Sequence, residues 1–291
     1  MNRDPFPAST IDGKLCLVTG ATSGIGAAAA PELARRGAHV LIHARDAGRG
    51  RATATAIIAS HPDAQLEVLS ADLARMDDVR RLAGTVEDTH GRLDVLINNA
   101  GVVNFTRRTT PDGHEHTLAV NHLAPFLLTH LLRPALSVPD EARVLSITSD
   151  HHKSVTAIPW QDMNTERDYK PLHVYNRTKL MNVWFTQILA ETLAGSGITA
   201  NCLSPGFVKT NLARDATGAF RTFIRLAAPF QSTPQTAAKA ITHLAGSPQL
   251  SGQSGGYYVK AVRTQPGGLA DDHDAALCLW RLSAELTGVT T

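Results

Sequence analysis

Short apolar runs alternate along the chain with longer segments in which apolar and polar positions repeat with a helical period. This alternation favours a parallel β-sheet covered by helices on both faces, and wholly apolar runs are typical of strands buried on both sides. We therefore expect a doubly wound α/β fold with a seven-stranded, mainly parallel sheet. The predicted strands are residues 15–18, 39–43, 65–70, 93–97, 143–148, 198–203 and 256–262. The predicted helices follow the first strand up to Gly37 and then include residues 53–60, 77–89, 113–136, 174–194 and 236–245.

Two segments, residues 150–173 and 207–232, do not fit this rhythm. Both are too long for ordinary connections, and loops of such length are usually lids or binding loops. We expect them to form the walls of a substrate pocket. Their aromatic residues suit a mainly apolar ligand, but packing against helices explains them equally well; they are Trp160, Phe207, Phe220, Phe223 and Phe230. No repeat or linker interrupts the chain, so residues 1–291 are expected to form one domain.

Composition narrows the function classes. The formal charge is +2 and the basic residues are scattered, so nothing indicates nucleic-acid binding. The 13 histidines show no spacing typical of a metal site, and we expect no metal. Three separated cysteines argue against a disulfide framework, and Cys16 and Cys202 lie inside apolar runs, as small hydrophobic residues would. No apolar run is long enough to span a membrane, and no signal peptide is evident, so we expect a cytoplasmic protein without membrane partners.

A glycine-rich turn, residues 19–26, joins the first strand to the first helix. Glycine allows the sharp turn and the close approach of a pyrophosphate, and the free N–H groups at the start of the helix attract its charge. This context predicts a Rossmann-type dinucleotide site. Pro31 interrupts the expected helix and has no functional explanation from the sequence.

The end of the second strand indicates which nicotinamide cofactor is used. An acidic side chain there would bind the ribose 2′-hydroxyl of NAD(H), whereas an arginine would meet the 2′-phosphate of NADP(H). Arg45 comes first and Asp46 follows, which favours NADP(H) and leaves NAD(H) as the alternative. A surface ion pair between these two residues is the competing interpretation.

Four motifs together resemble the short-chain dehydrogenase/reductase family: residues 19–26, 98–101, 175–179 and 205–206. The resemblance extends from Gly13 to Gly288, and residues 120–129, 204–210 and 279–283 are similar to the retinol dehydrogenase-like branch. Membrane-anchored members of that branch carry an N-terminal apolar segment that is not seen here. Retinol itself is therefore not implied as the substrate.

The resemblance also implies the site residues. The catalytic set would be Asn121, Ser149, Tyr175 and Lys179, with Ser149 orienting the substrate and Asn121 positioning a water beside Lys179. The cofactor would contact Gly20, Ser23, Gly24, Ile25, Gly26, Arg45, Asp72, Leu73, Asn99, Ala100, Gly101, Tyr175, Lys179, Pro205, Gly206, Val208 and Thr210. For Asp72, a position at a helix N-terminus is the competing explanation. Many members of the family are homodimers or homotetramers.

The residues themselves support acid–base chemistry. A carbonyl that receives hydride needs a proton on oxygen, but a tyrosine has a pKa of about 10 and is a poor acid–base group at neutral pH. A nearby cation lowers that pKa, and Tyr175 and Lys179 lie four residues apart, on one face of a predicted helix. We therefore expect an NADP(H)-dependent oxidoreductase that interconverts a carbonyl and an alcohol on a mainly apolar small molecule. A non-catalytic NADP(H)-binding redox sensor is the alternative.

Overall fold

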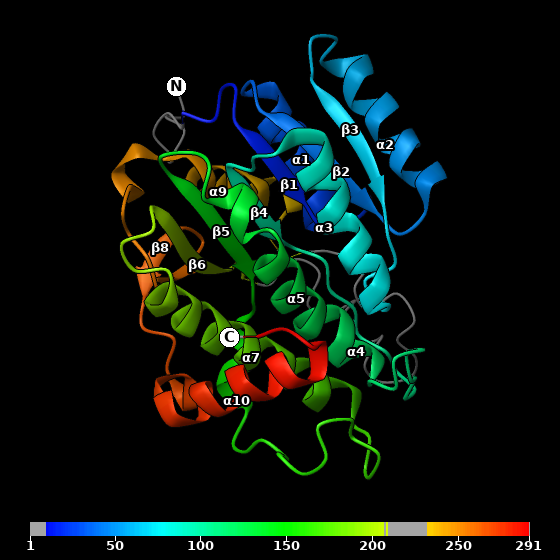
Figure 1. Ribbon diagram of the computed structural model, residues 1–291, viewed down its shortest axis with the longest axis vertical. Helices are drawn as coiled ribbons and strands as arrows, with labels where there is room; N and C mark the ends of the chain where they lie inside the picture. Colours follow the sequence, from blue (N-terminus) through cyan, green and yellow to red (C-terminus); the bar gives the residue numbers. More distant parts are fainter. Residues whose placement is uncertain (1–9, 207, 209–231, 291) are drawn as a thin grey trace.

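A sheet of eight strands forms the centre of the computed structural model, which describes residues 10–206, 208 and 232–290 (Figure 1). The strand order is β3-β2-β1-β4-β5-β6-β7-β8, and every neighbouring pair is parallel except β7 and β8. The strands are β1 (Leu15–Val18), β2 (His39–Ala44), β3 (Leu66–Ser70), β4 (Val95–Asn98), β5 (Ala142–Ile147), β6 (Ile198–Ser204), β7 (Tyr257–Val259) and β8 (Val262–Thr264).

Helices cover both faces of the sheet, which confirms the predicted doubly wound Rossmann fold (Figure 1). One face carries α1 (Gly24–Arg35), α2 (Ala47–Ser60) and α9 (Pro234–Gly246); the other carries α3 (Met76–His90), α5 (Ala124–Leu131), α7 (Pro171–Thr192) and α10 (His273–Thr287). The short helices are α4 (His116–Leu118), η1 (Ala119–Leu123), α6 (Arg133–Leu136), η2 (Asp150–Ser154), η5 (Pro248–Leu250) and η6 (Gly268–Asp271).

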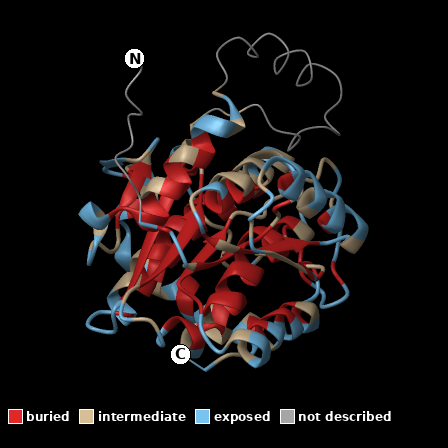
Figure 2. Cartoon of the chain, turned by 90° about the horizontal axis from the view of Figure 1, so that it is seen from above, coloured by how far each residue is buried: buried red, intermediate tan, exposed pale blue. Residues whose placement is uncertain are grey.

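The core is divided by the sheet into two apolar layers (Figure 2). Side chains alternate across β1: Leu15 and Leu17 pack into one layer, and Cys16 and Val18 into the other. Such alternation is the period of two that a strand imposes. Cys16 and Cys202 are buried free thiols, as expected of small hydrophobic residues, and burial raises the pKa of Cys202 to about 12.

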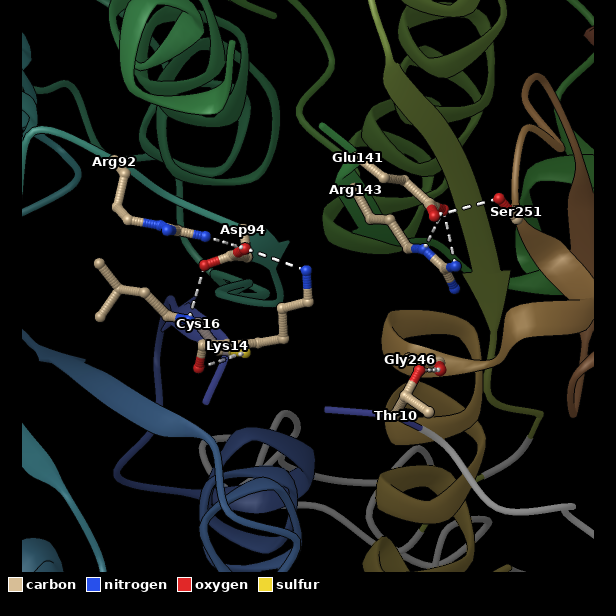
Figure 3. A network of polar contacts seen from close by, with 10 residues as sticks. Thr10, Lys14, Cys16, Arg92, Asp94, Glu141, Arg143, Gly246 and Ser251 are labelled. Atoms are coloured by element: carbon tan, nitrogen blue, oxygen red, sulfur yellow. Dashed lines mark hydrogen bonds and ion pairs between the residues drawn. The ribbon is translucent and has the colours of Figure 1, made fainter. Parts of the chain in front are cut away.

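Charged residues fix the amino-terminal edge of the sheet (Figure 3). Asp94 is 1% exposed and accepts hydrogen bonds from Leu15 N–H at 2.9 Å, Lys14 Nζ at 3.2 Å and Arg92 at 2.8 Å. Burial alone would raise the pKa of Asp94, but these donors outweigh it and hold the pKa below its usual range. The buried carboxylate therefore joins the starts of β1 and β4.

Two predicted elements were wrong in detail. Residues 256–262 are not one strand, because the chain turns at Lys260 and Ala261, both with positive φ, and returns as the antiparallel β8. The sheet therefore has eight strands, not seven. Residues 113–136 are not one helix: the chain becomes helical at His116, passes through the π-helical turn η1 and breaks again at Leu132, before Pro134. Pro31, in contrast, lies inside an α1 that continues to Arg35.

The two long segments expected to be loops, residues 150–173 and 207–232, compare differently with the structure. Residues 150–170 contain only the 3-10 turn η2, and α7 starts at Pro171, so most of the first segment is a loop as predicted. Trp160 is half-buried and stacks on Trp184 of α7 with ring centroids 6.3 Å apart, which favours helix packing for this residue. Of residues 207–232, only Val208 and Ser232 belong to the described residues, and Phe207, Phe220, Phe223 and Phe230 lie outside them.

Candidate active site

The carboxyl ends of the parallel strands meet at one edge of the sheet, and the predicted cofactor segments follow them there. The glycine-rich turn follows β1, Arg45 follows β2, residues 99–101 follow β4 and residues 205–206 follow β6. The strand order reverses between β1 and β4, which is where open α/β sheets bind ligands. The topology thus gathers residues that are distant in the sequence.

The turn before α1 leaves the start of that helix open. Ser23 is the N-cap residue but makes no side-chain capping hydrogen bond, and none of the described residues accepts a hydrogen bond from the N–H groups of Gly24, Ile25 or Gly26. Gly20 has a φ of +66°, and a Cβ on Gly26 would lie 2.4 Å from the Gly20 carbonyl oxygen. Glycine is therefore required at both positions, and the open N–H groups suit a phosphate.

Asn99 and Thr19 hold this turn against the end of β4. Asn99 Nδ2 donates to the Thr19 carbonyl at 2.7 Å, and Thr19 Oγ1 accepts the N–H groups of Asn99 at 2.9 Å and Ala100 at 3.0 Å. A Cβ on Gly101 would lie 3.5 Å from Lys179 Nζ, so this residue lies directly beside that ammonium group.

Arg45 is exposed at the end of β2 and forms no ion pair with any described residue. Asp46 accepts the N–H of Arg49 at 2.7 Å as the N-cap of α2, so the competing interpretation of an Arg45–Asp46 pair is wrong.

Asp72 accepts the N–H of Ala74 at 3.0 Å, while the N-cap of α3 is Arg75. Asp72 is therefore not the N-terminal acid of that helix.

Leu73, next to Asp72, is buried in the apolar core. Only its backbone could therefore face a cofactor.

Tyr175 and Lys179 lie one turn apart near the start of α7, beside the end of β5. Lys179 is 4% exposed and its Nζ donates to the Ile147 carbonyl at 2.9 Å. None of the other described residues accepts from its remaining N–H bonds. The same Nζ lies 5.5 Å from the centre of the Tyr175 ring. An ammonium group with spare donors is thus held next to a phenol.

Burial controls the ionisation of this pair. It raises the pKa of Tyr175 to about 12, although a hydrogen bond with Ser149 acts in the opposite direction. It also lowers the pKa of Lys179 to about 8. Burial therefore keeps the tyrosine protonated at neutral pH, and the lowering of its pKa by Lys179 stays a prediction.

Ser149 follows β5 with an extended backbone and lies at the start of η2, within hydrogen-bonding reach of Tyr175. Its neighbour Asp150 accepts hydrogen bonds from Ser204 Oγ at 2.8 Å and Tyr257 Oη at 3.0 Å. His152, fully buried, contacts the Ser149 carbonyl at 2.7 Å. Ser149 is therefore fixed by contacts that reach β6 and β7.

Asn121 lies in the π-helical turn η1, and π turns are frequent at functional sites. Pro125, four residues later, has no N–H to donate to the Asn121 carbonyl, so a regular α-helix cannot form there. The Asn121 side chain is fully buried: Oδ1 accepts Val102 N–H at 2.8 Å, and Nδ2 donates to the Val102 carbonyl at 3.0 Å and to Thr178 Oγ1 at 3.1 Å. The side chain has a structural role, and the backbone carbonyl lacks the α-helical donor that residue 125 would otherwise supply.

The family model for short chain dehydrogenases matches residues 14–219. The chain belongs to the short-chain dehydrogenase/reductase family. It lies in the retinol dehydrogenase-like branch, since human retinol dehydrogenase 12 is 37% identical over 279 residues that cover 96% of this chain and 88% of that protein. It is accordingly an oxidoreductase of the alcohol/carbonyl type.

Solved structures show the same fold. A protein of uncharacterized function from Mycobacterium paratuberculosis aligns with a TM-score of 0.78 and 33% identity, over 97% of this chain and 96% of that one. A protein from Beutenbergia cavernae, assigned as an NAD(P)-dependent gluconate 5-dehydrogenase and holding NADP at low occupancy, aligns with a TM-score of 0.69 and 26% identity, over 90% and 99% of the two chains.

The site of this short-chain dehydrogenase fits a nicotinamide dinucleotide. The open start of α1 can take the pyrophosphate, and the spare donors of Lys179 can take ribose hydroxyls. Pro205 is buried, Gly206 has a φ of +76°, and Val208 forms an isolated parallel bridge with Ser232 at the same edge. Thr210 lies outside the described residues.

Several contacts of this dehydrogenase site could not be found from motifs, namely those of His43, Asp150, His152, Ser204 and Tyr257. A cavity of about 290 Å³ beside α7 and β6–β8 is lined by none of the predicted catalytic residues. Among the described residues, no cluster of three or more metal-ligating side chains occurs, and no helix is both long and apolar enough to cross a membrane.

Proposed function

We propose that this short-chain dehydrogenase uses NADP(H) to interconvert a carbonyl and an alcohol on a mainly apolar small molecule, with Tyr175 as the acid–base residue. The observation that carries the proposal is the grouping of Ser149, Tyr175 and Lys179 at the end of β5, where Lys179 Nζ donates to only one acceptor among the described residues.

In the reductive direction the bound nicotinamide would supply a hydride to the carbonyl carbon. The hydroxyl groups of Ser149 and Tyr175 both donate to the carbonyl oxygen as negative charge develops on it. Tyr175, which is protonated at neutral pH, then transfers its proton to that oxygen. The developing phenolate is stabilised by the Lys179 ammonium group, because the single Ser149 proton is already donated to the substrate oxygen.

Lys179 serves two purposes in this scheme. Its bond to the Ile147 carbonyl fixes the side chain, and the remaining donors would hold the ribose next to the nicotinamide. The Asn121 carbonyl, released from its helical partner by Pro125, would hold a water that returns a proton to Tyr175 through this lysine.

The choice of NADP(H) is supported by Arg45. Its exposed guanidinium has no ion pair among the described residues, and Asp46 is occupied by its capping bond to Arg49. A 2′-phosphate would find an unpaired cation there, whereas the Asp46 carboxylate, which could accept from a 2′-hydroxyl, already accepts the Arg49 N–H through Oδ1.

A mainly apolar substrate is supported by the similarity to retinol dehydrogenases. The proposed substrate is therefore a small carbonyl or alcohol with an apolar body.

The test measures oxidation of NADPH and NADH by the purified chain with a panel of apolar aldehydes and ketones, and the reverse reaction with the matching alcohols. We expect turnover that prefers NADPH and that falls by roughly 10²- to 10⁴-fold in Tyr175→Phe, the usual contribution of a general acid. Tyr258→Phe, a buried tyrosine on β7, is the matched control and should keep its activity. Binding of NADPH without turnover across the whole panel would favour the redox-sensor alternative instead.

A further inference from the structure

His43 is the last residue but one of β2 and is 2% exposed. Its imidazole lies between two segments of the proposed cofactor site. Nδ1 accepts the N–H of Gly20, in the glycine-rich turn, at 3.1 Å, and Nε2 lies 3.1 Å from the Ala71 carbonyl, directly before Asp72. A single side chain therefore connects the turn after β1 with the loop after β3.

These contacts define the protonation state of the ring. The Gly20 N–H can only donate, so Nδ1 must be an unprotonated acceptor, and the Ala71 carbonyl can only accept, so Nε2 must carry the proton. One neutral tautomer satisfies both partners. Burial acts in the same direction and lowers the pKa of His43 to about 4, so the ring is neutral at neutral pH.

The bond to Gly20 also determines how the turn presents its amide groups. Gly20 has a positive φ, and its N–H is bonded to His43 on β2, whereas the N–H groups of Gly24, Ile25 and Gly26 stay open. Asn99 holds the other side of the turn through the Thr19 carbonyl at 2.7 Å. Hydrogen bonds thus hold the turn on two sides, from Asn99 after β4 and from His43 on β2.

We propose that His43 is a positioning residue for the dinucleotide, one that aligns the pyrophosphate-binding turn with the adenosine-binding loop at Asp72. The inference rests on the proposed use of a nicotinamide dinucleotide. It adds a determinant of cofactor affinity that touches neither the cofactor nor the reacting atoms and acts through the Gly20 backbone.

Three substitutions separate the two contacts. His43→Asn places an amide oxygen near the position of Nδ1 and keeps an acceptor for Gly20. His43→Gln places its amide near Nε2 and keeps a donor for Ala71 but loses the acceptor. His43→Leu loses both. His130→Gln, on α5 in the aromatic cluster with Phe126 and Trp280, is the control for an internal histidine remote from the turn.

The measurement is the Kd for NADPH by direct titration, followed by KM and kcat with a carbonyl substrate. We expect the Kd to rise roughly tenfold in His43→Gln and His43→Leu, equivalent to about 1.4 kcal/mol, and by no more than about threefold in His43→Asn. The kcat at saturating NADPH should stay within about twofold of wild type in all variants, because the catalytic residues are not displaced.

The outcomes are distinguishable. Wild-type protein that binds neither NADPH nor NADH would overturn the proposed function. If the wild-type protein binds NADPH, two results would overturn only the role of His43. One is a Kd for His43→Leu equal to that of wild type, and the other is an equal rise of the Kd in His43→Asn and His43→Gln. A second measurement covers variants that fold poorly: ¹⁵N NMR of the wild-type imidazole at about pH 7 should show the Nε2–H tautomer, and the other tautomer or the imidazolium would contradict the inference.

Discussion

At the scale of single residues, Arg45 gives the sharpest test of the cofactor assignment. Its guanidinium is exposed after β2. If Arg45 binds the 2′-phosphate as proposed, removing it costs NADPH charge-assisted hydrogen bonds that NADH cannot make. We expect Arg45→Ala to raise the KM for NADPH by at least about tenfold, from the roughly 1.5–3 kcal/mol that hydrogen bonds to charged groups contribute. The KM for NADH should be unchanged.

Steady-state kinetics with both cofactors measures this effect, and Arg51→Ala, an exposed arginine within α2, is the control. An unaltered ratio of the two KM values in Arg45→Ala would contradict the assignment of Arg45 to the 2′-phosphate.

Motif residues of the site could be predicted from the sequence because each depends on local geometry. The glycines at 20 and 26 reflect a backbone turn, and Tyr175 and Lys179 reflect the spacing of one helical turn. The ionisation of Tyr175 could not be predicted, because the burial that raises its pKa depends on the packing of distant segments. His43 has no motif at all: its importance comes from two partners that lie 23 and 28 residues away.

At the scale of elements, the β7–β8 hairpin carries avoidable strain. Its two-residue loop places Lys260 at a φ of +49° and Ala261 at +70°. Hairpins of this kind prefer Asn-Gly at these positions, because side chains of L-residues are disfavoured at positive φ. We expect the double substitution Lys260→Asn, Ala261→Gly to stabilise the protein by about 1–2 kcal/mol.

Thermal unfolding should accordingly show a Tm higher by a few degrees. Lys260→Gln alone, which removes the charge but keeps the strained conformation, is the matched control. A Tm that falls or stays constant in the double variant would show that the hairpin conformation is stabilised by contacts with these two side chains.

The elements that sequence patterns misjudged share a physical cause. Apolar residues in 113–136 do repeat with a helical period, since the segment packs against the core. This repeat does not reveal, however, that Pro125 and Pro134 remove backbone hydrogen bonds. The end of the sheet was misjudged because Lys260 and Ala261 are not typical turn residues.

At the scale of the whole molecule, buried histidines determine stability in mild acid. His43 and His122 both have a pKa lowered from 6.5 to about 4, chiefly by burial. The two histidines take up protons near pH 6.5 in the unfolded chain but not in the folded chain. The free energy of unfolding is therefore highest above about pH 6.5 and decreases as the pH falls toward 4. Each contributes a loss on the order of 1–3 kcal/mol across that window.

Chemical denaturation at a series of pH values measures this loss. His122→Gln, which cannot take up a proton at this position, should lose part of the pH dependence, although it also loses the contact of His122 Nε2 with Ser283 Oγ at 2.8 Å. His151→Gln, at an exposed position, should leave the slope as it is. A wild-type stability that is constant from about pH 7 to 4 would contradict neutral burial of both rings.

The strand order also has a consequence for how the chain folds. β1 pairs with β2 from the neighbouring sequence but also with β4, and the bond from Leu15 to Asp94 spans 79 residues. Contacts of such separation form slowly, because a long loop must be closed before they stabilise anything. During synthesis β1, α1, β2, α2 and β3 emerge first, so β1 waits with an unpaired apolar edge until β4 arrives. The seam at which the dinucleotide would sit is thus also the place where a nascent chain is most exposed to mispairing.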